Sequence, residues 1–279
     1  MIQFKSIVRT NCAIFCLMIA GLASSPAFGQ SLPLANEPDS DWRFTITPYA
    51  FLPVSTQGSS TVAGSTVDLD LDFSEALELL DFALSVRGEA WKGKWGIISD
   101  FYIVELEIDS SVGLPGPGGG SADIDVNIDQ KWVSLLGAYR FAEGSTGKGL
   151  RYAWDVSGGV RWNSIEQQID ASVAIGPGGQ TSLGGTEDWL EPMLGIRLTY
   201  EISERWTLAG RAEFGGFGVG GDDLQYTLLV GADWRVWETT SLKFGYQYYS
   251  IDFETDRSDG TFAYDVAQHG PYVGLTFRF

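Results

Sequence analysis

The sequence has 279 residues, with 36 acidic side chains, 18 basic side chains and a single histidine, and its net charge is −18. A surface that binds the phosphates of nucleic acid has to be basic, so this charge argues against DNA and RNA as partners. Hydrophobic residues make up 44% of the chain, which excludes a disordered protein. The 35 glycines and the 13% of aromatic residues favour strands and turns.

Residues 1–29 have the pattern of a secretory signal peptide. Lys5 and Arg9 precede an apolar stretch, and small residues then mark a cleavage site. We expect residues 30–41 to form a periplasmic linker and residues 42–279 to form one folded domain. Both cysteines lie in the predicted signal peptide, so the mature chain would have no cysteine nucleophile and no zinc–thiolate site.

From Trp42 onward, apolar and polar residues alternate with a period of two, which predicts strands. In residues 226–234, the even-numbered side chains are apolar or aromatic, and the odd-numbered ones are mostly polar or small. The alternation defines ten segments: 42–52, 82–91, 95–107, 122–141, 151–167, 187–200, 204–216, 223–236, 240–254 and 262–279. Mostly short turns join these segments at one end, and long loops at 53–81, 108–121 and 168–186 join them at the other.

A meander with short turns at one end and long loops at the other is typical of transmembrane β-barrels, whose short turns face the periplasm. We therefore predict an all-β fold, a closed antiparallel barrel of about ten strands in the bacterial outer membrane. The count would be twelve if residues 55–71 formed an extra hairpin. We expect no cofactor.

Tryptophans near the predicted periplasmic turns favour this barrel over a secreted β-sandwich. A membrane barrel carries aromatic residues at the bilayer interfaces, whereas a sandwich core has no need of them at strand ends. The residues are Trp42, Trp91, Trp95, Trp206, Trp234 and Trp237.

The last segment alternates up to the terminal Phe279. A terminal aromatic residue on such a strand resembles the signal that bacterial outer-membrane barrels present to their assembly machinery. We therefore expect that machinery, together with outer-membrane lipid and lipopolysaccharide, as the partners of the chain.

Four segments resemble a family of Gram-negative outer-membrane β-barrels that mostly have no assigned function. They are Thr45–Phe51, Trp189–Arg197, Glu213–Asp222 and His269–Phe279. The resemblance covers nearly the whole mature chain and implies the fold and the location. It implies no reaction, no ligand and no functional residue.

Histidine chemistry has little support in the sequence. Catalysis in outer-membrane hydrolases needs a histidine near a serine or an aspartate, and this chain has only His269. Asp265 lies four residues earlier, about 13 Å along an extended strand, which is too far for a hydrogen bond. We predict that the protein is not an enzyme and that His269 is a wall or rim residue.

Two rows of acidic residues alternate with apolar ones on the predicted extracellular side. Oxygen ligands at this density can hold Ca²⁺ or Mg²⁺, including ions that bridge lipopolysaccharide phosphates, while the simpler alternative is a solvated loop face. The rows contain Asp68, Asp70 and Asp72, and Asp123, Asp125 and Asp129.

Residues 72–80 predict a short helix in the longest loop. Asp72 and Glu75 have the spacing of a capping box, and Phe73, Ala76, Leu77 and Leu80 then share one face. We expect that face to pack against the barrel mouth or to enter the outer leaflet.

The polar faces of the strands predict a barrel interior in which six bases face six acids. We expect these residues to line the lumen: Arg87, Glu89, Asp100, Asp155, Arg161, Glu191, Arg197, Arg211, Glu213, Asp233, Arg235 and Lys243. The alternation is ambiguous in 95–107 and 122–141, so Asp100 is the least secure of these.

This interior allows two functions. One is a narrow channel for small solutes or ions, in which acidic mouths favour cations. The other is a non-conducting structural or surface-interaction barrel, whose interior charges pair with one another.

Overall fold

The computed structural model describes residues 41–114, 120–173, 179–219 and 224–279. The predicted signal peptide and residues 30–40 of the predicted linker lie outside this range. Within it the chain forms these elements: β1 (Arg43–Phe51), β2 (Ser55–Val62), β3 (Ser65–Asp72), α1 (Phe73–Glu78), β4 (Leu80–Lys92), β5 (Trp95–Leu114), β6 (Gly120–Ser145), β7 (Arg151–Val173), β8 (Gly179–Glu201), β9 (Trp206–Gly215), β10 (Leu224–Arg235), β11 (Thr240–Arg257) and β12 (Gly260–Arg278). No helix in the described part of the chain is long and apolar enough to cross a membrane.

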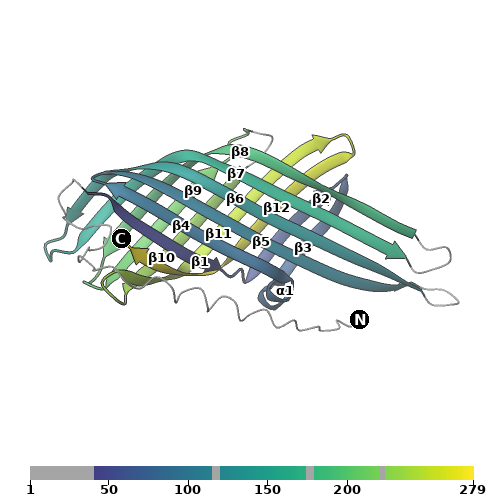
Figure 1. The fold of residues 1–279 in the computed structure, drawn as a ribbon, viewed down its shortest axis with the longest axis horizontal. Helices are drawn as coiled ribbons and strands as arrows, with labels where there is room; N and C mark the ends of the chain where they lie inside the picture. The colour runs from purple at the N-terminus through teal and green to yellow at the C-terminus, as the bar shows by residue number, and fades with distance from the viewer. Residues whose placement is uncertain (1–40, 115–119, 174–178, 220–223) are drawn as a thin grey trace.

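Ten of the strands close into an antiparallel barrel, which confirms the predicted fold (Figure 1). Strands β4 to β12 pair in chain order, and β1 closes the ring by pairing with both β4 and β12. The residues of the additional hairpin do form strands β2 and β3. They pair with the outer part of β12 and do not enter the ring, because β12 is long enough to serve both β1 and β2.

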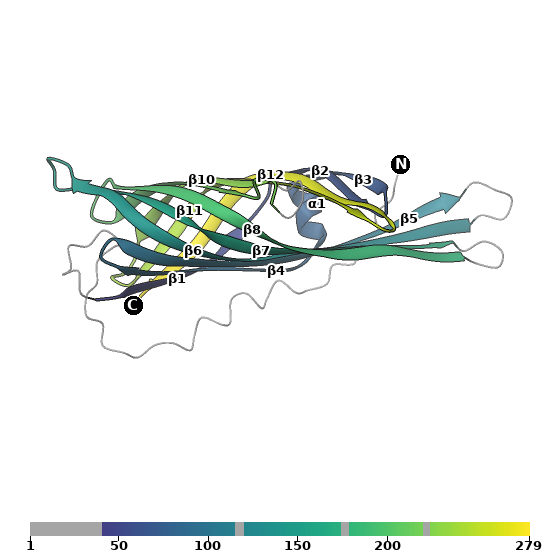
Figure 2. The same ribbon diagram turned by 90° about the horizontal axis from the view of Figure 1, so that it is seen from above.

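The two ends of the barrel differ. Short turns, such as the one after Lys92 in which Gly93 has a φ of 56°, lie at the end where β1 begins and β12 finishes. By the rule for outer-membrane barrels this end is periplasmic. At the other end β5 to β8 project far beyond the ring (Figure 2).

The prediction of long loops at 108–121 and 168–186 is wrong for most of their residues, which belong to the projecting strands. Pairing between β5 and β6 continues to Leu114 and Gly120, and pairing between β7 and β8 continues to Val173 and Gly179. Most of both predicted loops is therefore strand.

The outward face of the periplasmic half is apolar, as a lipid-facing wall requires. Leu135, Leu194 and Val230 point outward and are 56%, 58% and 71% exposed. Trp95 and Trp237 are also exposed near the periplasmic turns, where aromatic side chains meet the bilayer interface. Trp91 corrects the predicted girdle, because it is buried inside the barrel at 3% exposure.

In the outer half of the barrel, which includes the projecting ends of β5 to β8, apolar side chains lie inside and polar side chains lie outside. Strands β5 to β8 face β11, β12, β2 and β3 across an apolar core. The core consists of Val62, Leu69, Tyr102, Ile128, Trp132, Ile165, Trp189, Tyr249, Ile251, Phe253, Phe262, Tyr264 and Val266. On the outside of the same strands lie polar residues such as Glu166, Gln168 and Asp252, which indicates that this half stands in water above the membrane.

Helix α1 forms where the sequence predicts it. The Asp72 carboxylate accepts hydrogen bonds from the Ser74 and Glu75 amides, and the Glu75 carboxylate accepts one from the Asp72 amide. No residue of α1 is buried, and Phe73 and Leu77 are 40% and 46% exposed. The apolar face is therefore not packed against the barrel mouth, and its entry into the outer leaflet stays a prediction.

Candidate functional site

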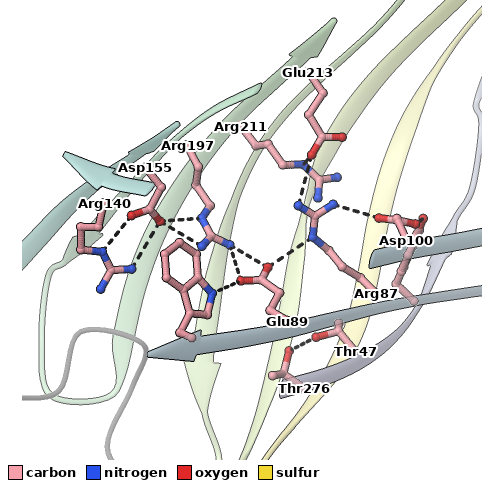
Figure 3. A network of polar contacts seen from close by, with 12 residues as sticks. Thr47, Arg87, Glu89, Asp100, Arg140, Asp155, Arg197, Arg211, Glu213 and Thr276 are labelled. Carbon is pink, nitrogen blue, oxygen red and sulfur yellow. Dashed lines mark hydrogen bonds and ion pairs between the residues drawn. The ribbon is translucent and has the colours of Figure 1, made fainter. Parts of the chain in front are cut away.

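The candidate site is the barrel interior, where most of the residues expected to line the lumen meet. Ion pairs join residues of β4 to residues of β8 and β9 on the opposite wall, so these side chains cross the lumen (Figure 3). Asp100, whose orientation the sequence left open, is buried and points inward. Arg235 follows the inward-facing Asp233 by two positions, at the periplasmic end of β10.

Arg87 is the centre of the first group of contacts. Its guanidinium donates hydrogen bonds to the carboxylates of Asp100 at 2.9 Å, Glu213 at 3.1 Å and Glu89 at 3.2 Å. The Tyr49 hydroxyl donates to the second oxygen of Asp100 at 2.7 Å. Arg87 on β4 therefore links β5, β9 on the opposite wall and, through Asp100, β1.

Arg197 is the centre of a second group. It donates to Glu89 at 2.7 Å and to Asp155 at 2.9 Å, and Asp155 also accepts a 2.8 Å bond from Arg140. Trp91 donates from its indole nitrogen to Glu89 at 2.9 Å, and the guanidinium carbons of Arg140 and Arg197 lie 4.9 Å and 5.5 Å from its ring centre. Burial of Trp91 in this group explains its absence from the outer girdle.

Smaller contacts extend the network in both directions. Toward the outside, Arg161 donates to Gln225 at 2.6 Å and lies 3.7 Å from Glu213, and Glu191 is fully buried. Toward the periplasm, Arg278 donates to Ser241 at 2.7 Å and pairs with Asp233 at 3.3 Å.

Arg140 and Arg278 are two inward-facing bases that the sequence reasoning did not include. Arg278 lies on the polar face of the closing strand, β12. The alternation of this strand is therefore a signal that could have predicted its inward orientation. Arg140 lies directly opposite Asp155 in the β6–β7 register, but the ambiguous alternation of residues 122–141 concealed its orientation. With both included, eight bases and six acids are named among the described interior residues.

An aromatic layer lies above the charged network. The rings of Tyr102 and Trp132 stack with centres 3.7 Å apart, and the Tyr249 ring stacks on Trp132 from the opposite wall at 5.4 Å. Trp189 and Phe253 form a second cross-barrel stack at 3.9 Å. The interior thus contains two layers of different chemistry, both of which connect opposite walls.

A cavity of about 110 Å³ lies on the periplasmic side of the aromatic layer, and side chains of the charged network form part of its wall. Its wall includes Trp91, Thr207, Asp233 and Arg278, each within a few residues of a periplasmic strand end. The cavity therefore extends toward the periplasmic end of the barrel.

His269 lies on the outside of the barrel. Its Nδ1 atom is 2.6 Å from the Tyr246 hydroxyl, and its ring stacks against Tyr248. Among the described residues, no carboxylate or serine hydroxyl forms a hydrogen bond with the imidazole. This geometry gives a catalytic role no support, and the absence of enzymatic activity stays a prediction.

The aspartates proposed as cation ligands do not come together. Asp68 and Asp70 lie on β3, whereas Asp125 and Asp129 lie on β6, and Asp129 pairs with Lys131 at 3.1 Å. No three acidic, histidine or cysteine side chains in the described part of the chain are arranged to hold a metal ion. The side chain of Asp123 lies outside the described residues.

The Asp72 carboxylate, the remaining one of the six, serves as the cap of α1. Hydrogen bonds from the Glu75 amide and from Ser74 lower the pKa of Asp72. Its oxygens therefore have structural partners within the chain.

Comparison with known proteins supports the fold. No protein-family model matches the chain, and no curated protein matches it. The outer membrane protease OmpT from Escherichia coli is similar in structure, with a TM-score of 0.52 and 10% identity, over 87% of this chain and 98% of that chain. The translocator domain of the autotransporter NalP from Neisseria meningitidis covers 88% of this chain and 91% of its own, with a TM-score of 0.41 and 14% identity.

At these identities the likeness concerns the fold alone, and the family resemblance of the sequence stays a prediction. The location follows from the barrel itself. A closed antiparallel barrel leaves no strand edge unpaired in the bilayer, and an apolar belt on its outside matches the lipid. The chain is an integral β-barrel protein of the bacterial outer membrane.

Proposed function

We propose that the protein is a non-conducting outer-membrane barrel in its resting state. The observation that carries this proposal is the filling of the interior by two successive layers, the ion-pair network around Arg87 and Arg197 and the aromatic layer around Trp132. Ten strands enclose little space, so side chains from opposite walls meet in the middle.

Each layer obstructs ions in a different way. In the network, Arg87 and Arg197 already pair with carboxylates, and an ion that passed through would have to break these buried ion pairs. In the aromatic layer, rings from opposite walls stack on one another, with centres 3.9 Å apart for Trp189 and Phe253 and 5.4 Å apart for Trp132 and Tyr249. An ion would have to give up its hydration there without any polar replacement.

A barrel that does not conduct can have a structural role in the outer membrane or a role in binding at the cell surface. We call the part of β5 to β8, β11 and β12 that lies outside the membrane the outer extension. It presents acidic side chains to the exterior, including Glu166, Asp252 and Glu254. We propose that divalent cations bridge this surface to the phosphates of lipopolysaccharide at the cell exterior. We also propose that the last strand, whose terminal Phe279 is 61% exposed, presents the signal for the assembly machinery.

The second candidate is a narrow channel that opens when the aromatic layer moves. The cavity with charged side chains in its wall favours it, because this cavity would be the periplasmic part of such a path. Its wall contains more bases than acids, so an opened path would favour anions, whereas the acidic mouths predicted from the sequence favour cations.

Single-channel recording in a planar bilayer tests the proposal. The refolded mature protein, with folding checked by heat-shifted gel mobility, should produce no steady current steps. Trp132→Ala removes the central ring of the aromatic layer and should produce transient openings. The matched control Trp162→Ala removes an outward-facing ring, 40% exposed on β7, and should stay silent. Steady steps from the wild-type protein would overturn the proposal.

A further inference from the structure

The periplasmic cavity has an unusual charge. Six bases contribute to its wall, and only two acids do so. The bases are Arg87, Arg140, Arg197, Arg211, Lys243 and Arg278, and the acids are Glu89 and Asp233. This excess of positive charge occurs in a chain whose net charge is −18.

Three of these bases retain hydrogen-bonding capacity, whereas Arg87, Arg140 and Arg197 are held by carboxylates. Arg278 is nine-tenths buried, and its Nε and Nη1 atoms have no hydrogen-bond partner among the described residues. Arg211 makes one long ion pair, 3.7 Å to Glu213, and its Nε atom has no hydrogen-bond partner in the described part of the chain.

Lys243 is the third base. Asp233 is its cross-strand neighbour on β10, but the Asp233 carboxylate accepts hydrogen bonds from Ser241 and Arg278 instead. No carboxylate of the described residues lies within 4.0 Å of the Lys243 ammonium group. The cations Arg197 and Arg278 and the acids Glu89 and Asp233 all line the same cavity as this group.

Buried donors without acceptors and an uncompensated charge both lower stability. Water molecules satisfy the donors but do not neutralise the charge. An oxyanion does both, because its oxygens accept short, charge-assisted hydrogen bonds from guanidinium and ammonium groups. The cavity volume of about 110 Å³ suits an ion of the size of phosphate, sulfate or a short carboxylate.

We propose that this cavity is a binding site for a small oxyanion, held by Arg211, Lys243 and Arg278 and taken up from the periplasm. The periplasmic route follows from the position of the cavity near the short turns, since the aromatic layer lies between it and the outside. The site would give the barrel a ligand without making it a channel.

Titration calorimetry on the refolded protein tests the site, with inorganic phosphate, sulfate and acetate as separate probes. Lys243→Gln keeps a polar side chain but removes the charge, and it should weaken binding about tenfold or more. Arg211→Gln should act in the same direction. The control Lys148→Gln removes an exposed base in the turn after β6 and should leave binding unchanged. Heat-shifted gel mobility confirms that each variant has folded.

Two results would overturn the proposal. One is the absence of binding of all three anions to the wild-type protein at concentrations up to about 10 mM, beyond which affinity is too weak to be specific. The other is binding that Lys243→Gln and Arg211→Gln leave unchanged. Because binding is measured without a membrane potential or a current, failure here is separate from failure of the non-conducting proposal.

Discussion

The two halves of the barrel are built in opposite ways. In the periplasmic half, charges such as Arg87 and Glu213 lie inside, and apolar side chains such as Val230 face outward. In the outer half, aromatic rings such as Trp132 lie inside, and acidic residues such as Glu166 face outward. One continuous set of strands therefore changes the chemistry of both its faces along its length.

The surroundings explain this inversion. Lipid is as apolar as a protein core, so the periplasmic half gains nothing by burying apolar side chains and can place polar ones in its interior. The outer half stands in water, where burial of apolar surface is the main stabilising force. On β6 the change takes place within a few residues, since Leu135 points outward to lipid and Trp132 points into the aromatic layer.

The largest effect is expected from the aromatic layer. Trp132→Ala removes a ring that contacts Tyr102 and Tyr249 and should lower the free energy of unfolding by about 4 kcal/mol. Urea unfolding in lipid vesicles measures this loss. The control Trp162→Ala, on the outward face, should cost clearly less. Equal losses would mean that Trp132 is packed no more tightly in the aromatic layer than Trp162 is packed against lipid.

The charged layer is tested by Glu213→Gln. This carboxylate faces three guanidiniums, those of Arg87, Arg161 and Arg211. Its neutralisation leaves buried positive charge and should cost about 3 kcal/mol in the same unfolding measurement. Glu204→Gln, in an exposed turn, should be close to neutral. A loss below about 1 kcal/mol at Glu213 would indicate that water screens the network as it screens a surface pair.

A third experiment compares the outward faces of the two halves by placing an arginine on each. Val230→Arg places a charge on the apolar belt and should lower the stability of the vesicle-inserted protein by about 2 kcal/mol. Gln168→Arg makes a similar change on the exposed outer extension and should shift stability by less than about 0.5 kcal/mol. Similar costs at the two positions would contradict the assignment of one half to lipid and the other to water.

The smallest effect concerns the cap of α1. Asp72→Ala removes the acceptor for the Ser74 and Glu75 amides, so hydrogen exchange at these amides should become faster while the barrel stays intact. The pKa of Asp72 is lowered from its ordinary value of 3.8 by these bonds, so the cap is fully charged at neutral pH. Its contribution should be lost only as the pH falls through the lowered pKa. Unchanged exchange rates in Asp72→Ala would show that the cap does not hold the helix.

Alternation in the sequence was sufficient to predict the strands and the closed barrel, but its phase was ambiguous on β5 and β6. The inward-facing residues of β6 explain this, because they mix apolar and polar side chains, with Ile128 and Leu136 among the former and Gln130 and Ser134 among the latter. Neither face of this strand is polar along its whole length.

The partners of the interior charges were beyond the reach of the sequence. Arg87 and Glu213 are 126 positions apart, and their contact depends on the tilt and stagger of the closed barrel. For the same reason, the position of Trp91 near a turn suggested the interface, while its indole in fact meets Glu89 inside.

Side-specific labelling of a single cysteine tests the central claim most directly. Ala209 lines the periplasmic cavity, and the predicted mature chain has no cysteine of its own. In vesicles whose orientation is read from Gln168→Cys on the outer extension, a membrane-impermeant thiol reagent should modify Ala209→Cys from the periplasmic side only. Modification from the outer side at a comparable rate would show an open path through both layers and would contradict the account.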